Sequence, residues 1–299
     1  MNTGQMNQTV WGWKIAAYLF GAGMGAGAFA FSGYLTLVPK LTENGVAQRG
    51  MWLGVVVTAL SAGFLVWDLG KPMRFLRVLM NVSHSWLSRG AVILMAFCLS
   101  AIVTIVTGSP TALVWISMVL AIAVATYTGV LLGTMLARPL WNNSLLPMIF
   151  LTSALSTGIA LLDVGGMASS ATSSSMVSAF QTTVANLRWA HAFLLVIEVV
   201  MLYFLVNLSK SRSRAAADML TKGNLRYGFW GGVLAAGILG PLVLIAISTA
   251  TGGSAANSLL FVGDLGVLFG GFMLRRVILF VGTRGLVELG VRFTIRPEI

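Results

Sequence analysis

Several ionisable side chains interrupt long apolar stretches of this sequence, where a charged group is costly to bury. Three of them are carboxylic acids within or beside apolar runs: Asp68, Glu198 and Asp264. Two further groups, Asp163 and His191, lie near the ends of such runs. An uncompensated charge in hydrocarbon costs several kcal/mol, so each residue is a candidate for proton transfer or ligand binding. His191 precedes Glu198 by seven residues, so a helix would place both side chains on one face.

Glu198 and Asp264 have no basic residue near them in the sequence that could neutralise their charge. Desolvation therefore favours the neutral, protonated form of each carboxyl group. Such a pair of acids could carry protons toward one membrane surface, past His191 and Asp163. The alternative is that these acids hydrogen-bond to neighbouring helices and serve packing alone.

Two tyrosines and a carboxyl group could form a different kind of site. Tyr18 lies in the first turns of one apolar run, and Asp68 ends the next run. Tyr127 precedes Arg138 by 11 residues, which would place it about 16 Å deeper in a continuous helix. These groups could line one pocket, in which Asp68 accepts a proton from a membrane-soluble substrate. Alternatively, Asp68 forms a salt bridge with nearby bases and Tyr127 is a packing aromatic.

The histidine and cysteine content argues against a metal or haem centre in this chain. A haem with two histidine ligands needs both imidazoles at one depth in the membrane. The two histidines, His84 and His191, are expected near opposite surfaces. The single cysteine, Cys98, can form no paired metal site and is expected to be a small buried hydrophobic residue. We therefore expect electrons, if any are exchanged, to pass to or from another subunit.

The composition predicts that these residues are positioned by membrane-spanning helices. Of the 299 residues, 57% are hydrophobic and 9% are charged, whereas about a quarter of the residues of a soluble domain are charged. A spanning helix needs about 20 predominantly apolar residues. Eight runs of suitable length predict an all-α integral membrane protein with eight transmembrane helices, at residues 13–38, 51–69, 89–107, 111–137, 145–165, 189–208, 228–250 and 257–281.

The net charge of +11 would indicate nucleic-acid binding in a soluble protein. In a membrane protein, the distribution of the basic residues between the two sides indicates the topology instead. With eight helices, 16 of the 19 basic residues fall on the side that holds both termini. The positive-inside rule then predicts cytoplasmic termini in a multi-pass protein of the cell's inner membrane. A basic docking surface for an acidic subunit would produce the same asymmetry. We expect lipid and protein partners, and no nucleic acid.

An internal repeat predicts two four-helix bundles within a single membrane domain, at residues 1–143 and 144–299. The pattern of small residues in YLFGAGMGAG (18–27) recurs in IFLTSALSTG (149–158), and YTGVLLGTMLAR (127–138) resembles DLGVLFGGFMLR (264–275). The offsets, 131 and 137 residues, are similar. The repeat makes Asp264 the equivalent of Tyr127. Chance similarity among glycine-rich apolar segments is the alternative.

Taken in order, several segments resemble the NrfD/PsrC family, the membrane subunits of polysulfide-reductase-type complexes. Tyr18 stands where several family members have histidine, and Arg89 replaces a usual tryptophan. The resemblance extends over most of the chain and is carried by WGWKIAAYLFGAGMGAGAF (11–29), DLGKPMRF (68–75), SWLSRG (85–90), YTGVLLG…RPLWNNSLLPMIFLTSALSTG (127–158), Glu198 and LRRVILFVG (274–282).

This resemblance implies a subunit that exchanges electrons with a quinone, either menaquinone or ubiquinone, and has no redox centre of its own. It implies a quinone pocket in the first half, lined by Tyr18, Asp68 and Tyr127. It also implies two partners: a four-cluster ferredoxin-like iron–sulfur subunit and a molybdopterin-type catalytic subunit. The residues expected to dock the partner are Lys71, Arg74 and Arg138.

Two other classes of membrane protein remain compatible with the sequence. A secondary transporter, or a proton-translocating subunit without redox chemistry, would also combine repeats, glycine-rich helices and buried acids. A purely structural anchor would need neither Asp68 nor Tyr127.

Overall fold

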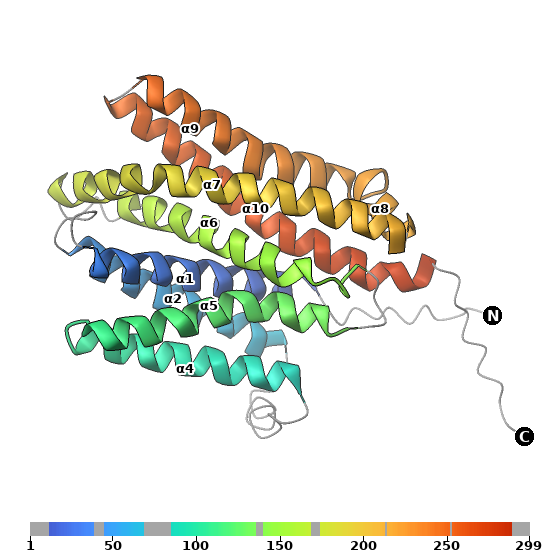
Figure 1. Cartoon of the computed structure of the whole chain (residues 1–299), viewed down its shortest axis with the longest axis horizontal. Coiled ribbons are helices and arrows are strands. Elements are labelled where there is room, and N and C mark those ends of the chain that lie inside the picture. The colour runs from blue at the N-terminus through green and yellow to red at the C-terminus, as the bar shows by residue number, and fades with distance from the viewer. Residues whose placement is uncertain are drawn as a thin grey trace, which may run out of the picture.

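The computed structural model describes residues 12–38, 45–68, 85–135, 140–168, 174–212, 214–251 and 253–288. Every regular element among them is a helix, and the long helices run side by side along one axis (Figure 1). In chain order the elements are α1 (Trp13–Leu37), α2 (Val46–Asp68), α4 (Trp86–Val106), α5 (Thr111–Gly133), α6 (Leu145–Ala168), α7 (Ser174–Arg212), α8 (Arg214–Thr221), η3 (Tyr227–Leu239), α9 (Gly240–Thr251) and α10 (Gly253–Glu288).

Within the described residues, eight helical segments are long and apolar enough to cross a bilayer. This finding confirms the predicted all-α membrane fold, and each predicted run coincides with one of these segments. The seventh crossing combines η3 and α9. The sixth belongs to α7, a helix of 39 residues that begins well before the predicted start at residue 189. Eight crossings place the start of α1 and the end of α10 on the same side.

The two central helices, α1 and α6, cross in close contact through small residues. A Cβ atom on Gly27 would overlap the carbonyl oxygen of Ala154, and one on Gly158 would overlap the backbone of Gly27. Helix backbones in a membrane approach this closely only where side chains are small or absent. Gly27 and Gly158 are equivalent positions of the predicted repeat, so the two halves of the chain meet at matching residues.

Each half of the chain forms a group of four spanning helices. In the first half, α5 packs against α1 and α4, and α2 packs along α1. In the second half, α10 packs against α6, η3 and α9, and α7 packs along α6. The helices α5 and α10 also reach across, to α6 and α1 respectively. The two halves are therefore joined through α1, α5, α6 and α10.

The seventh spanning segment changes its hydrogen-bond register at Pro241. Its first part, η3, is a π-helix of 13 residues, and its second part, α9, begins at Gly240. The N–H of Gly240 donates to the carbonyl of Ala235, five residues earlier. Proline has no N–H and its ring crowds the preceding turn, which accounts for a π-to-α transition beside Pro241.

The fourth spanning helix is shorter than the sequence predicted. The expected end was Arg138, but α5 ends at Gly133, where the backbone N–H of the following Thr134 donates to carbonyls of the last turn. The indole N–H of Trp141 donates to the carbonyl of Ile278 at 2.8 Å and fixes the linking segment against α10. The estimate that Tyr127 lies 11 helical residues from Arg138 is therefore wrong, because the helix ends six residues after Tyr127.

Candidate functional site

Two tyrosines are buried close together in the first half of the chain. Tyr18 of α1 is 2% exposed, and Tyr127 of α5 is 5% exposed. Their phenol groups are near enough to interact electrostatically. The hydroxyl of Tyr127 has no hydrogen-bond partner among the described residues. A buried polar atom left unpaired costs about 1–3 kcal/mol, so this oxygen marks a position suited to a polar atom of a ligand.

A glycine in α4 leaves the space that the Tyr127 ring occupies. A Cβ atom on Gly90 would overlap both the ring and the hydroxyl oxygen of Tyr127. On the other side, a Cβ on Gly129 would meet the backbone of Pro147 at 2.5 Å. Gly90 therefore lets α4 pack directly against the Tyr127 ring, and Gly129 lets α5 approach the start of α6 closely.

The backbone of Asp68 lies at the end of the bundle where α1 begins. The preceding residue, Trp67, packs edge-on against Trp13, with 6.1 Å between ring centroids. The ammonium group of Lys14 lies 4.5 Å from the centroid of the Trp67 ring. Asp68 and Tyr18 therefore belong to the same end of the molecule, as predicted. The expected docking residues Lys71, Arg74 and Arg138 lie outside the described residues.

A series of polar side chains connects three helices of the second half. The carboxyl group of Asp163 on α6 lies near enough to that of Asp264 on α10 for the two to interact. The Oδ1 atom of Asp264 lies 3.5 Å from Nδ1 of His191, which belongs to α7. The other ring nitrogen of His191, Nε2, lies 3.1 Å from the hydroxyl oxygen of Ser156 on α6. Asp163, His191 and Asp264 are each at most 4% exposed, so their polar atoms depend on one another.

A second polar cluster lies nearer the end of the bundle that holds Tyr18. The guanidinium of Arg275 donates to the hydroxyl of Ser153 at 2.5 Å and to the carbonyl of Phe150 at 3.3 Å. Glu198 lies near enough to Arg275 and to the hydroxyl of Ser153 to interact with both. The Arg275 guanidinium carbon also lies 5.9 Å from the centroid of the Phe20 ring of α1. This cluster therefore joins the second half of the chain to the first.

The two clusters line up along the same three helices. On α6, Ser153 and Ser156 are one turn apart, and on α7, His191 and Glu198 are two turns apart. Polar groups therefore extend through the second half from Asp163 to the Arg275 cluster. The expected grouping of Glu198, Asp264, His191 and Asp163 lies along this line, with the two serines between its ends.

One functional candidate was missed by reasoning from the sequence. Arg275 was assigned to the basic membrane surface, but its side chain is 0% exposed and lies between helices. No basic residue lies near Glu198 in the sequence, but α10 brings the guanidinium of Arg275 near enough to interact with it electrostatically. The repeat pattern carried a signal, since Arg275 is the equivalent of Arg138. It could not show that α10 continues past this position while α5 ends before it.

Comparison with known proteins identifies the family. The sequence profile described as "Polysulphide reductase, NrfD" matches residues 1–109 and 98–285. The protein is 30% identical to the C subunit of polysulfide reductase of Wolinella succinogenes, over 93% of its own length and 96% of that subunit. The protein belongs to the NrfD family. It is also 25% identical to protein NrfD of Escherichia coli, over 91% of its own length and 95% of that protein.

Membership of the NrfD family confirms the resemblance seen in the sequence. A third NrfD-family relative, the protein NrfD homolog of Haemophilus influenzae, is 27% identical over 78% of this protein and 82% of its own length. The matches cover both halves of the sequence. The family assignment and the eight apolar helices together establish a multi-pass membrane protein.

Proposed function

We propose that this NrfD-family protein is the quinone-reactive membrane subunit of a respiratory oxidoreductase complex. In this role it exchanges electrons between the quinone pool, either menaquinone or ubiquinone, and an iron–sulfur partner. The observation that carries the proposal is the Tyr127 hydroxyl, which is buried beside Tyr18 and has no partner among the described residues. One relative, the C subunit of polysulfide reductase, belongs to an oxidoreductase by its name.

The side chains of the first half fit a quinone. The Tyr127 hydroxyl can donate a hydrogen bond to a carbonyl oxygen, and the Tyr18 ring supplies an aromatic wall close to it. The backbone of Asp68 lies at the membrane boundary nearest Tyr18, where a carboxylate could accept a proton released from a quinol. The two electrons and two protons of the reaction would come from the bound quinol, because no side chain of this pocket can supply electrons.

The electrons must leave this subunit for a partner. By analogy with the family, that partner is a four-cluster ferredoxin-like iron–sulfur protein, accompanied by a molybdopterin-type catalytic subunit. The docking surface we propose includes Lys71, Arg74 and Arg138, on the side where α1 begins and α10 ends. We place the complex in the cell's inner membrane, with cytoplasmic termini.

A proton route through the second half is a further part of this proposal. It is favoured by the continuous contacts from Asp163 through Asp264 and His191 to Ser156. The Ser153, Glu198 and Arg275 cluster would extend the route toward the Tyr18 end. Without redox chemistry, the same arrangement would suit a proton-coupled transporter, which is the alternative function.

The quinone proposal is tested by replacing Tyr127 with phenylalanine. Tyr127→Phe removes one hydroxyl and keeps the ring, so the loss of a hydrogen bond should cost about 1 kcal/mol, or about fivefold in quinone affinity. Asp68→Asn should impair turnover more, because a proton acceptor is lost. The readout is quinol-dependent reduction of the iron–sulfur partner in the purified complex.

Tyr34→Phe is the matched control, because Tyr34 lies on α1 and is 42% exposed. It should leave quinol oxidation unchanged. Unchanged kinetics in Tyr127→Phe and Asp68→Asn would contradict the quinone site. Uptake of a solute by the isolated protein in liposomes, without a redox partner, would favour the transporter.

A further inference from the structure

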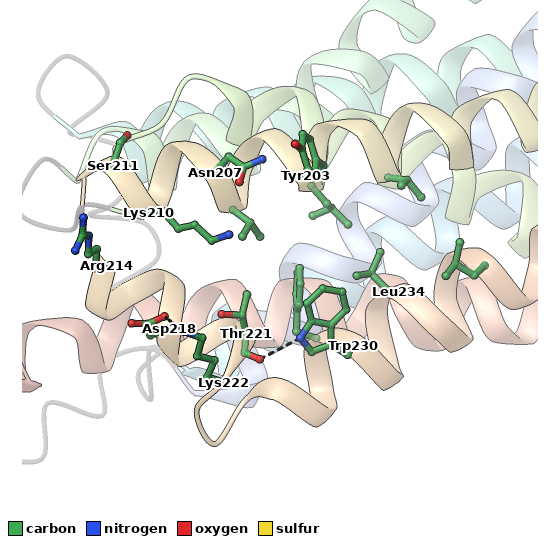
Figure 2. A pocket seen from close by; sticks show the side chains of 15 residues that line it. Tyr203, Asn207, Lys210, Ser211, Arg214, Asp218, Thr221, Lys222, Trp230 and Leu234 are labelled. Carbon is green, nitrogen blue, oxygen red and sulfur yellow. Dashed lines mark hydrogen bonds and ion pairs between the residues drawn. The ribbon is translucent and has the colours of Figure 1, made fainter.

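A large groove lies outside both polar clusters, along an adjacent face of α7. It has a volume of about 1130 Å³ and lies between α7, α8 and η3. It forms because α7 packs chiefly on α6 while η3 packs chiefly on α10, so that α7 and η3 have little direct contact. Figure 2 shows the side chains of both walls pointing into the space between these helices.

The groove is apolar along its length and cationic at one end. The apolar walls come from α7 and η3 and include Val199, Val206 and Leu234. The end closed by α8 is polar, and Figure 2 shows Lys210, Arg214 and Lys222 around it. A single carboxylate, Asp218, lies there and pairs with Lys222 at 3.6 Å. Three cations and one carboxylate leave two net positive charges at the mouth.

The dimensions of the groove match one leaflet of a bilayer. Val199 and Lys210 both line it and are 11 residues apart on α7, a distance of about 16 Å along the helix. Half of a hydrocarbon core about 30 Å thick is about 15 Å. The cationic mouth is therefore at the level of lipid head groups when the apolar walls are at the level of acyl chains.

An aromatic residue at the cationic mouth of the groove also indicates that this mouth lies at the level of the lipid head groups. The indole N–H of Trp230 donates to the carbonyl of Thr221 at 3.1 Å, across from η3 to the end of α8. Trp230 is 52% exposed, and both residues line the groove (Figure 2). Tryptophan side chains concentrate at the boundary between hydrocarbon and head groups. The hydrogen bond also holds α8 in place over the groove.

From these observations we infer that the groove binds an anionic glycerophospholipid of the leaflet in which α8 lies. The phosphate group would lie between Lys210 and Arg214, and an acyl chain would pack along Val206 and Leu234. Basic pockets between membrane helices favour anionic head groups in this way. The inference is independent of the quinone proposal, because the groove uses none of the residues assigned to quinone or proton transfer.

The test uses the full-length protein purified in detergent and depleted of lipid. Phosphatidylglycerol and phosphatidylcholine with identical acyl chains are added separately, and bound lipid is counted by native mass spectrometry while the melting temperature is followed. We expect one tightly retained phosphatidylglycerol and a larger rise in melting temperature than with phosphatidylcholine. The double variant Lys210→Gln/Arg214→Gln should weaken phosphatidylglycerol binding about tenfold or more.

Two further variants separate the head group from the acyl chain and from general charge. Val206→Trp fills the groove without changing charge, and it should reduce retention of both lipids. Arg226→Gln removes an exposed positive charge from the same membrane side, but Arg226 donates to the Tyr227 hydroxyl at 2.7 Å and does not line the groove. This control should bind phosphatidylglycerol as the unmodified protein does.

Several results would overturn the inference. Equal affinity for phosphatidylglycerol and phosphatidylcholine would show that Lys210 and Arg214 do not select the head group. Normal phosphatidylglycerol binding by the double variant would show the same. An equal rise in melting temperature with inorganic phosphate alone would show that no lipid is needed. Because Lys210 and Arg214 are both exposed, the double variant can be tested even if Val206→Trp does not fold.

Discussion

Nδ1 of His191 and Oδ1 of Asp264 lie 3.5 Å apart within the second half of the bundle. The pair joins α7 to α10 across 73 residues of sequence, since 264 minus 191 is 73. The hydroxyl of Ser156 lies beside Nε2 of His191. Asp163 interacts with Asp264. A histidine held at both nitrogens has a fixed ring orientation, which suits a proton route and also satisfies the polar atoms of a packed core.

The His191–Asp264 contact should be measurable as a coupling energy. A double-mutant cycle with His191→Gln and Asp264→Asn, followed by unfolding in detergent, should give a coupling of about 0.6–1.7 kcal/mol, as for side-chain hydrogen bonds in other membrane proteins. The matched cycle pairs His191→Gln with Asp218→Asn on α8, where no coupling is expected. A coupling near zero in the first cycle would contradict the contact.

Glu198→Gln should distinguish proton transfer from packing. Glutamine keeps the shape of the side chain and can still hydrogen-bond to Ser153, so the complex should remain stable. If Glu198 carries protons, quinone turnover should slow or lose its response to the membrane potential. Turnover and proton release in liposomes are the measurements, with the exposed Asp218→Asn as control. Unchanged values for both would leave Glu198 as a structural acid.

Loss of Arg275 should destabilise the protein strongly. Arg275→Gln removes the guanidinium hydrogen bonds to Ser153 and Phe150 and the positive charge that interacts with buried Glu198, and removing one charge from a buried network costs about 3–5 kcal/mol. The neighbouring Arg276 is exposed, so Arg276→Gln should change the free energy of unfolding by less than about 0.5 kcal/mol. Adding Glu198→Gln to Arg275→Gln should restore part of the stability. No difference between the two single variants would refute the buried role of Arg275.

Gly90→Ala should displace the ring of Tyr127. The added methyl group would overlap the ring and hydroxyl oxygen, and overpacking of this kind costs about 1–3 kcal/mol. We expect slower quinol oxidation and a higher KM for quinol. In Gly63→Ala, the new methyl group would meet no atom within 4 Å, so this variant should behave normally. Normal quinol kinetics in Gly90→Ala would mean that the position of Tyr127 does not matter.

The orientation of the protein in the membrane can be measured with alkaline phosphatase, which is active only outside the cytoplasm. The positive-inside rule predicts an inactive enzyme when it is fused to the C-terminus. A fusion at Ser109, in the turn between α4 and α5 on the opposite side, should be active. The reverse pattern would place the termini outside and move the proposed partner to that side.

The sequence alone determined the membrane fold, because each spanning helix is encoded locally. A run of about 20 apolar residues must form a helix in lipid, where backbone groups find no other partners. The same local signals placed Glu198, Asp264 and Tyr127 inside the membrane. The match between the α1 and α6 segments also predicted which helices are equivalent, since small residues at matching positions mark close helix packing.

Tertiary structure decided which buried groups meet. Arg275 and Glu198 are 77 residues apart, since 275 minus 198 is 77, and no local pattern indicates that they interact electrostatically. Two similar segments also end differently: α5 ends at Gly133 and α10 continues to Glu288, because residues outside the repeat determine where each helix ends. Similarly, Gly90 reaches Tyr127 only through the packing of α4 on α5. Burial and pairing of charge depend on neighbours from distant parts of the sequence, which helix periodicity does not encode.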